Sequence, residues 1–124
     1  MPESVESKRV LIVEDEPYLC DLIADVLEAE GHVPIKAANG LEALSHLPAT
    51  PPQLILLDLM MPVMDGWEFM AALRSNPVWA DIPVVLITAV YDVARSQQET
   101  GAKAVITKPF DIDQLVDVVN SYAA

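Results

Sequence analysis

The chain has 124 residues, of which 52% are hydrophobic, and a formal net charge of −12 at pH 7. A chain of this length and hydrophobicity forms one domain with a sizeable core, which argues against intrinsic disorder. The excess of acidic residues argues against direct nucleic acid binding through the phosphate backbone and favours basic partners or a cation.

Location and domain boundaries are predicted from the cysteine count and the N-terminal residues. Cys20 is the only cysteine, so no internal disulfide is possible and a reducing compartment is expected. The first residues lack the apolar segment of a signal peptide, and no apolar run approaches the roughly 20 residues that span a bilayer. We therefore expect a cytoplasmic protein that does not bind a membrane, with a flexible tail over residues 1–7 and one domain over residues 8–124.

The first predicted elements are a buried strand, a helix and an edge strand. Arg9–Val13 is short, apolar and rich in β-branched residues, as buried strands are. Proline suits the first turn of a helix and glycine its end, so the next helix is expected to run from Pro17 to Gly31. Val33–Ala37 is predicted to be an edge strand, because Pro34 has no N–H to donate to a neighbouring strand.

The central part of the chain is expected to form a second helix and a third strand. Asn39 is predicted to cap that helix, since Leu41, Leu44 and Leu47 follow it at helical spacing. Leu54–Leu57 is apolar without alternation, which is typical of a strand buried on both faces of a parallel sheet.

The second half of the chain continues the alternation of helices and strands. The predicted elements are a helix from Trp67 to Asn76, a strand at Val84–Ile87, a helix at Asp92–Glu99, a strand at Lys103–Thr107 and a helix beginning near Asp111. The Asp92–Glu99 helix has few apolar residues to bury, so it is expected to be the mobile one. Five strands alternating with five helices predict an α/β fold: a flavodoxin-like, doubly wound parallel sheet of order 2-1-3-4-5 with helices on both faces.

Functional groups lie at the ends of four of the five predicted strands. Glu14 and Asp15 follow the first strand, Asp58 the third and Lys108 the fifth, and Thr88 ends the fourth. The carboxyl ends of parallel strands lie at one edge of the sheet, where open α/β sheets bind ligands. A carboxylate inside the strand would be strongly desolvated, whereas at its end Asp58 would point into this crevice. We therefore predict that Asp58 is the reactive residue.

Together these groups indicate phosphoryl transfer onto an aspartate. Three neighbouring carboxylates repel one another unless a cation neutralises them, and hard oxygen ligands suit Mg²⁺. Lys108 supplies a compact positive charge and Thr88 a hydroxyl, both suited to a phosphoryl oxygen. Singly, each residue also has a structural explanation, such as a helix cap or an exposed turn lysine, but their coincidence at one edge favours phosphoryl transfer. His32 and His46 are interpreted as ordinary surface or helix residues.

At these residues the sequence resembles the receiver domain of two-component response regulators, the CheY-like superfamily of phosphorelay signal transduction. The resemblance covers nearly the whole chain. It rests on four segments in order: VLIVEDEP at Val10–Pro17, LILLDLMMPVMDGWE at Leu54–Glu68, VVLITA at Val84–Ala89 and GAKAVITKPF at Gly101–Phe110.

The resemblance implies a role for each acidic residue of the site. Asp58 would be the phosphoacceptor of a phosphoprotein and would carry an aspartyl phosphate. Asp15 and Asp58 would hold Mg²⁺, with the backbone carbonyl of Met60 as the third protein ligand and Glu14 acting mostly through water.

The resemblance also implies a switch and its partners. Lys108 would bridge to the phosphoryl group, with a cis bond to Pro109, and Thr88 would move to hydrogen-bond it. The change would reach the surface of the fourth helix, fifth strand and fifth helix, where a downstream protein binds or a monomer becomes a phosphorylation-dependent dimer. The phosphoryl donor would be a histidine kinase or a histidine phosphotransfer protein, and the chain would be a regulator, not an enzyme.

Two departures from the family pattern concern the switch and the phosphate lifetime. Val105 stands where the family often has a Tyr or Phe that swings inward, so output is expected to depend more on backbone shifts and the fourth helix. Met60 and Val90, which in the family flank the path of the attacking water, are apolar here. We expect the lifetime of the acyl phosphate to respond to polar substitution at both positions.

Two other functions suit the fold but not these residues. A phosphatase of the haloacid dehalogenase type needs an acid two residues after its nucleophile, where this chain has Met60. A flavodoxin-like module for a nucleotide or flavin needs a phosphate-binding loop after the first strand, where Glu14, Asp15 and Glu16 would repel a phosphate. Both a stand-alone receiver and a fragment of a longer regulator fit the sequence, and the N-terminal methionine favours a natural start.

Overall fold

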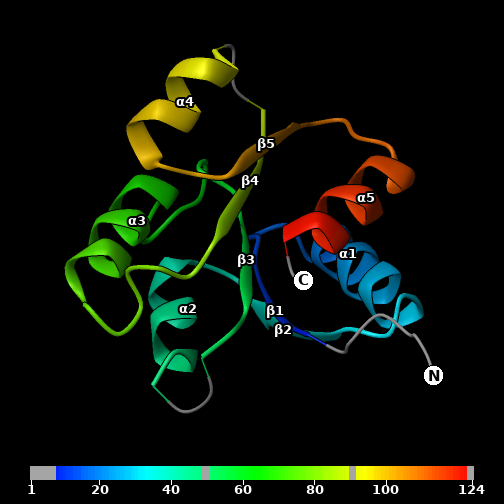
Figure 1. Ribbon diagram of the computed structural model, residues 1–124, viewed down its shortest axis with the longest axis horizontal. Helices are drawn as coiled ribbons and strands as arrows, with labels where there is room; N and C mark the ends of the chain where they lie inside the picture. Colours follow the sequence, from blue (N-terminus) through cyan, green and yellow to red (C-terminus); the bar gives the residue numbers. More distant parts are fainter. Residues whose placement is uncertain (1–7, 49–50, 90–91, 123–124) are drawn as a thin grey trace.

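A parallel sheet of five strands forms the centre of the computed structural model (Figure 1), which describes residues 8–48, 51–89 and 92–122. The strands are ordered β2-β1-β3-β4-β5, so the predicted topology is confirmed. Their bounds are β1 Arg9–Val13, β2 Val33–Ala37, β3 Leu54–Leu57, β4 Val84–Thr88 and β5 Ala104–Thr107. The predicted tail over residues 1–7 lies outside the described residues.

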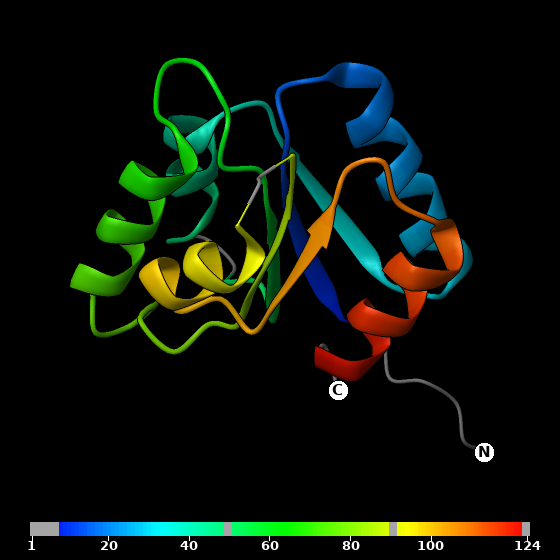
Figure 2. The ribbon, with the colours of Figure 1, turned by 90° about the horizontal axis from the view of Figure 1, so that it is seen from above.

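Five helices cover the two faces of this sheet. They are α1 Pro17–Ala29, α2 Gly40–His46, α3 Gly66–Ser75, α4 Val93–Thr100 and α5 Ile112–Tyr122. Helices α1 and α5 lie on one face, whereas α2, α3 and α4 lie on the other, as the two views agree (Figures 1 and 2). No helix in the described ranges is long and apolar enough to cross a membrane.

Each central strand contributes alternate side chains to two hydrophobic cores. In β1, Val10 and Ile12 belong to the core beneath α1 and α5, while Leu11 and Val13 belong to the core beneath α2 and α3. All four residues of β3 are at most 1% exposed. Burial on both faces explains why this strand is apolar throughout, since each large side chain removed from water stabilises the fold by about 1.5–3 kcal/mol.

A proline in an edge strand, an asparagine at a helix start and a glycine at a helix end each have the structural role that is typical of the residue. Strand β2, which contains Pro34, lies at the edge of the sheet as predicted. Asn39 caps α2 as predicted, because its side-chain oxygen accepts a hydrogen bond from the backbone N–H of Glu42 at 2.8 Å. Gly101 caps the carboxyl end of α4, and its φ of 72° is in the left-handed region that glycine tolerates best.

Helix α3 begins with a capping box that was not anticipated from the sequence. The Asp65 carboxylate accepts from the Glu68 N–H at 2.9 Å, and the Glu68 carboxylate accepts from the Asp65 N–H at 3.0 Å. These two bonds satisfy backbone donors that the first turn of a helix leaves free. They fix the direction in which the chain enters α3.

His32 is not the surface residue that the sequence suggested. It is only 4% exposed, and its Nε2 lies 3.0 Å from the Oδ1 of Asn120 in α5. Gly31, with a φ of 87°, turns the chain after α1, and the N–H of His32 donates to the carbonyl of Leu27. This turn places the imidazole beneath α5, so packing between elements distant in sequence buries it.

Candidate functional site

The backbone hydrogen bonds of the sheet extend one residue beyond the ends of three strands. The N–H of Glu14 donates to the carbonyl of Ala37 at 3.0 Å, and the N–H of Asp58 donates to the carbonyl of Val13 at 3.0 Å. On the other side, the N–H of Lys108 donates to the carbonyl of Thr88 at 3.1 Å. The predicted site residues are therefore held in position by the sheet itself, at its carboxyl edge.

Two buried carboxylates share one lysine at this edge. The Nζ of Lys108 lies 2.8 Å from the Oε1 of Glu14 and 2.8 Å from the Oδ2 of Asp58. Glu14 is 3% exposed and Asp58 is 4% exposed. Buried charges are tolerated only when they are paired and hydrogen-bonded, and Lys108 meets this condition for both carboxylates.

The remaining carboxylate oxygens accept hydrogen bonds from nearby backbone N–H groups. The Oε2 of Glu14 accepts from the N–H of Glu16 at 3.0 Å, and the Oδ1 of Asp58 accepts from the N–H of Met60 at 3.0 Å. Each carboxylate is therefore bonded through both oxygens, which fixes its orientation at the edge of the sheet.

Burial and charge shift two pKa values at the site. Burial raises the pKa of Glu14 above its ordinary 4.5, and the negative charge of Asp58 adds to this, although the bonds from Lys108 and the Glu16 N–H oppose it. Burial by itself would lower the pKa of Lys108, but its hydrogen bonds to Asp58 and Glu14 outweigh burial and raise that pKa above 10.5. Lys108 is therefore charged at neutral pH.

The donor set at this edge fits a hard divalent cation. Glu14, Asp15 and Asp58 each offer a carboxylate oxygen, and these atoms lie within 4.8 Å of one another. Lys108 carries one positive charge and so cannot neutralise three carboxylates. Oxygen ligands and the remaining negative charge suit Mg²⁺, which binds through a few carboxylates and keeps several waters.

Thr88 contributes a hydroxyl group that has no partner in the described part of the chain. The residue is 0% exposed, and its Oγ1 makes no hydrogen bond there. A buried hydroxyl without a partner costs about 1–3 kcal/mol. Such a group is available to donate to a ligand oxygen, and Thr88 is the last residue of β4, beside the backbone of Lys108.

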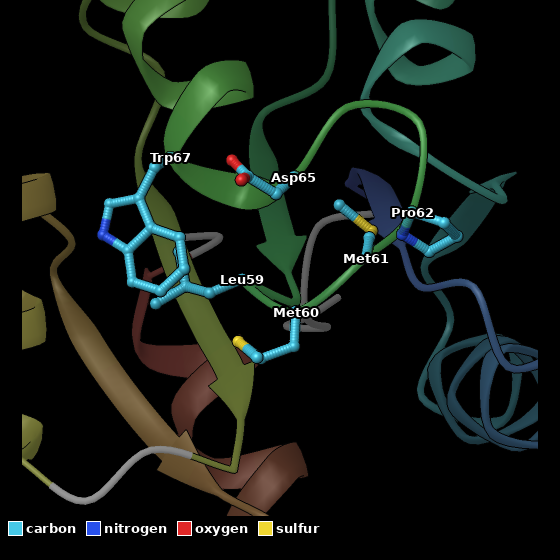
Figure 3. A pocket seen from close by; sticks show the side chains of 6 residues that line it. All are labelled: Leu59, Met60, Met61, Pro62, Asp65 and Trp67. Carbon is cyan, nitrogen blue, oxygen red and sulfur yellow. The ribbon is translucent and has the colours of Figure 1, made fainter.

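The loop after Asp58 surrounds a hollow on the surface (Figure 3). The hollow has a volume of about 390 Å³ and is lined by Leu59, Met60, Met61, Pro62, Asp65 and Trp67. Gly66 closes this loop, and its N–H donates to the Leu59 carbonyl at 3.0 Å. A Cβ on Gly66 would lie 2.8 Å from the Asp58 carbonyl oxygen and 2.6 Å from the Leu59 Cα, so only glycine fits there.

The structure therefore brings together Glu14, Asp15, Asp58 and Lys108, four of the residues singled out in the sequence. The direct bond between Lys108 and Glu14 was not anticipated, because Glu14 was expected to act mainly through water. The Lys108–Pro109 bond is cis, as expected.

Val105 is half-buried against the core beneath α2 and α3, whereas Val90 lies outside the described residues.

Comparison with known proteins assigns the chain to a family. The family model for the response regulator receiver domain matches residues 10–120, so the chain belongs to the receiver domain family of two-component signalling. It is 36% identical over 118 residues to the sporulation initiation phosphotransferase F of Bacillus subtilis, covering 94% of each chain.

Other relatives are longer than this chain. It is 40% identical over 113 residues to the phosphate regulon transcriptional regulatory protein PhoB of Escherichia coli, covering 89% of this chain and 49% of PhoB. The chain thus spans about half the length of the transcriptional regulators that it matches. Among solved structures, it is similar to the signal receiver domain of a signal transduction histidine kinase from Syntrophus aciditrophicus, with a TM-score of 0.86, 37% identity and coverage of 94% and 90% of the two chains.

Proposed function

We propose that Asp58 accepts a phosphoryl group from a phosphohistidine of a histidine kinase or a histidine phosphotransfer protein. The observation that carries this proposal is the buried Asp58 carboxylate, oriented through both oxygens and bonded to Lys108 at 2.8 Å. Membership of the receiver family and the acidic cluster beside Asp58 support the same function.

In the proposed reaction, an oxygen of the Asp58 carboxylate attacks the phosphorus atom of the phosphohistidine. The P–O bond to Asp58 forms as the P–N bond breaks, and the electron pair of that bond stays on the imidazole nitrogen. Lys108, already charged and within reach of Asp58, binds an oxygen of the arriving phosphoryl group. The N–H of Met60 keeps the carboxylate oriented during the transfer.

Mg²⁺ would be held by Asp15, Asp58 and the backbone carbonyl of Met60, with Glu14 acting mostly through water. When bound, the ion supplies positive charge that offsets the repulsion between the phosphoryl oxygens and the carboxylates. Lys108, which follows β5, also supplies positive charge to the site, because its ammonium group bonds to both Glu14 and Asp58.

The unpartnered hydroxyl of Thr88 supplies the response to phosphorylation. Its Oγ1 would donate to a phosphoryl oxygen on Asp58, and the movement would be passed to α4, β5 and α5. A partner protein, or a second copy of the chain, would bind the altered surface, so the chain acts as a regulator. With Val105 at the place of the usual aromatic residue, the signal would travel mainly through the backbone and α4.

The proposal is tested by treating the protein with acetyl phosphate, with Mg²⁺ or with EDTA, and measuring intact mass. Wild type is expected to gain one phosphoryl group only with Mg²⁺, and Asp58→Asn is expected to gain none. Asp81→Asn is the control, because Asp81 is exposed and lies just before the amino end of β4, away from Thr88. This variant should be labelled like wild type. Labelling without Mg²⁺, or equal labelling of Asp58→Asn, would overturn the assignment.

A further inference from the structure

An exposed thioether lies next to the proposed phosphoacceptor. Met60 is 62% exposed, whereas Met61 and Met70 are 8% and 4% exposed, and Met64 is half-buried. Peroxides convert exposed methionines to sulfoxides, and burial protects the others. Of the methionines in the described ranges, Met60 is therefore the one most open to oxidation.

The backbone of Met60 is bound to the reactive carboxylate. Its N–H donates to the Oδ1 of Asp58 at 3.0 Å, so the exposed side chain of Met60 starts from a backbone position fixed beside that carboxylate. Figure 3 shows the Met60 thioether on the same side of the loop as Leu59 and Trp67, with Met61 and Pro62 on the other side. The hollow in the loop that follows Asp58 is lined mainly by apolar side chains, with Asp65 as its one carboxylate.

We propose that Met60 is a peroxide-sensitive modification site, and that its oxidation shortens the lifetime of the phosphoryl group on Asp58. This inference rests on the proposed function. The Met60 sulfur attacks the hydroxyl oxygen of a peroxide, and an S–O bond forms as the O–O bond breaks. The other oxygen leaves as water or an alcohol after taking the proton of the transferred hydroxyl. The sulfur is oxidised by two electrons to a sulfoxide, and the peroxide is reduced by the same two electrons.

The sulfoxide changes how water behaves at the site. A thioether is a weak hydrogen-bond acceptor, whereas a sulfoxide oxygen accepts strongly from water. A water molecule held beside Asp58 is positioned to attack the phosphorus of the acyl phosphate. One such hydrogen bond accelerates hydrolysis by about fivefold.

The experiment compares wild type, Met60→Leu and Met64→Leu before and after treatment with hydrogen peroxide. Peptide mass spectrometry locates the sulfoxides, and the decay of radiolabelled acyl phosphate gives the ratio of rates after and before treatment. In wild type, Met60 is expected to be oxidised before Met61, Met64 and Met70, and the ratio is expected to reach about five. The same ratio is expected for Met64→Leu, whereas Met60→Leu should give a ratio of one whatever its starting rate.

Three results would overturn the inference: oxidation of Met61, Met64 or Met70 before Met60, a ratio of one in wild type with Met60 oxidised, or an equal rise in Met60→Leu. Methionine sulfoxide reductase should return the oxidised wild type to its slow decay. If untreated protein takes up no phosphoryl group, the proposed function fails and the inference fails with it. Failure of the proposed function can be told apart from failure of the inference alone, because peptide mass spectrometry locates the sulfoxides whether or not the protein is phosphorylated.

Discussion

The Nζ of Lys108 lies 2.8 Å from the Oδ2 of Asp58, and the same ammonium group lies 2.8 Å from the Oε1 of Glu14. One side chain therefore connects the ends of β1, β3 and β5. The carboxylates are almost fully buried, so their negative charges depend on this contact, and the atoms that we propose for phosphoryl transfer also affect the stability of the fold.

Removing the charge of Lys108 is expected to destabilise the metal-free protein. Lys108→Met keeps most of the side-chain length but leaves Glu14 and Asp58 buried without a counter-charge, which costs about 3 kcal/mol. Mg²⁺ should restore part of this loss, because it neutralises the same carboxylates. Urea unfolding in EDTA and in Mg²⁺ measures both effects. Lys103→Met, at an exposed position just before β5 and away from the site, is the control, and an equal loss in both variants would contradict the prediction.

The raised pKa of Glu14 gives its replacement a pH-dependent effect. The folded protein holds a proton on Glu14 more readily than the unfolded chain does. The contribution of Glu14 to the free energy of unfolding is therefore greatest below pH 4.5 and is lost as pH rises through the raised pKa. The free energy of unfolding of Glu14→Gln, relative to wild type, should therefore increase as pH rises from 4.5 towards neutral. Urea unfolding across this range measures the difference, and Glu28→Gln on the exposed side of α1 controls for the loss of one negative charge. A difference that falls with pH would contradict the prediction.

Thr88→Val is expected to separate stability from signalling. Valine has nearly the same shape and removes a buried hydroxyl that has no partner, so the free energy of unfolding should be unchanged or about 1 kcal/mol higher. The amide shifts of α4 and β5 that follow beryllofluoride binding should nevertheless be reduced, as NMR spectra would show.

Thr100→Val is the matched control for that substitution. The Thr100 hydroxyl donates to the Ser96 carbonyl at 2.7 Å and accepts from the Ala102 N–H at 3.3 Å, so its loss should cost about 1–2 kcal/mol. Similar destabilisation of the Thr88 and Thr100 variants would show that the Thr88 hydroxyl is bonded after all.

The capping box of α3 can be tested by changing one residue in two ways. Asp65→Ala removes the side-chain acceptor for the Glu68 N–H and should lower the free energy of unfolding by about 1 kcal/mol. Asp65→Asn retains an acceptor oxygen and should lose much less. Thermal or urea unfolding distinguishes them, and equal stability of the two variants would argue against the cap.

Polar substitution at the two positions that flank the path of the attacking water in the family, Met60 and Val90, is expected to shorten the lifetime of the acyl phosphate. Met60→Asn and Val90→Glu each introduce a group that can hold a water molecule, and each should accelerate decay by about fivefold. Decay of radiolabelled phosphate measures the effect in each variant. Unchanged dephosphorylation rates in both variants would contradict the prediction that apolar side chains at these positions lengthen the lifetime of the acyl phosphate.

The fold and the membership of the candidate site follow largely from local sequence patterns. The unbroken apolar run Leu54–Leu57 indicated a strand buried on both faces, and the topology then required Asp58 and Lys108 to lie at one edge. The bond between Lys108 and Glu14 was not predictable in this way, because it depends on side-chain rotamers and on distances between strands. His32 was missed for a similar reason, since its partner Asn120 lies 88 residues away in the chain.

The Asp65–Glu68 capping box was within reach of sequence analysis. The pair stands at the spacing of a capping box, before the apolar positions of α3. The box was not anticipated because the helix was predicted to begin at Trp67, whereas α3 begins at Gly66, directly after Asp65.

Gly66 gives the loop after Asp58 a fixed base. Its N–H donates to the carbonyl of Leu59, and its missing side chain allows the start of α3 to contact the backbone of Asp58 and Leu59. The two ends of the loop are thereby joined to each other, independently of the residues between them. Natural or engineered changes in the length of the segment 61–64 can therefore reshape this part of the surface while Asp58 keeps its place.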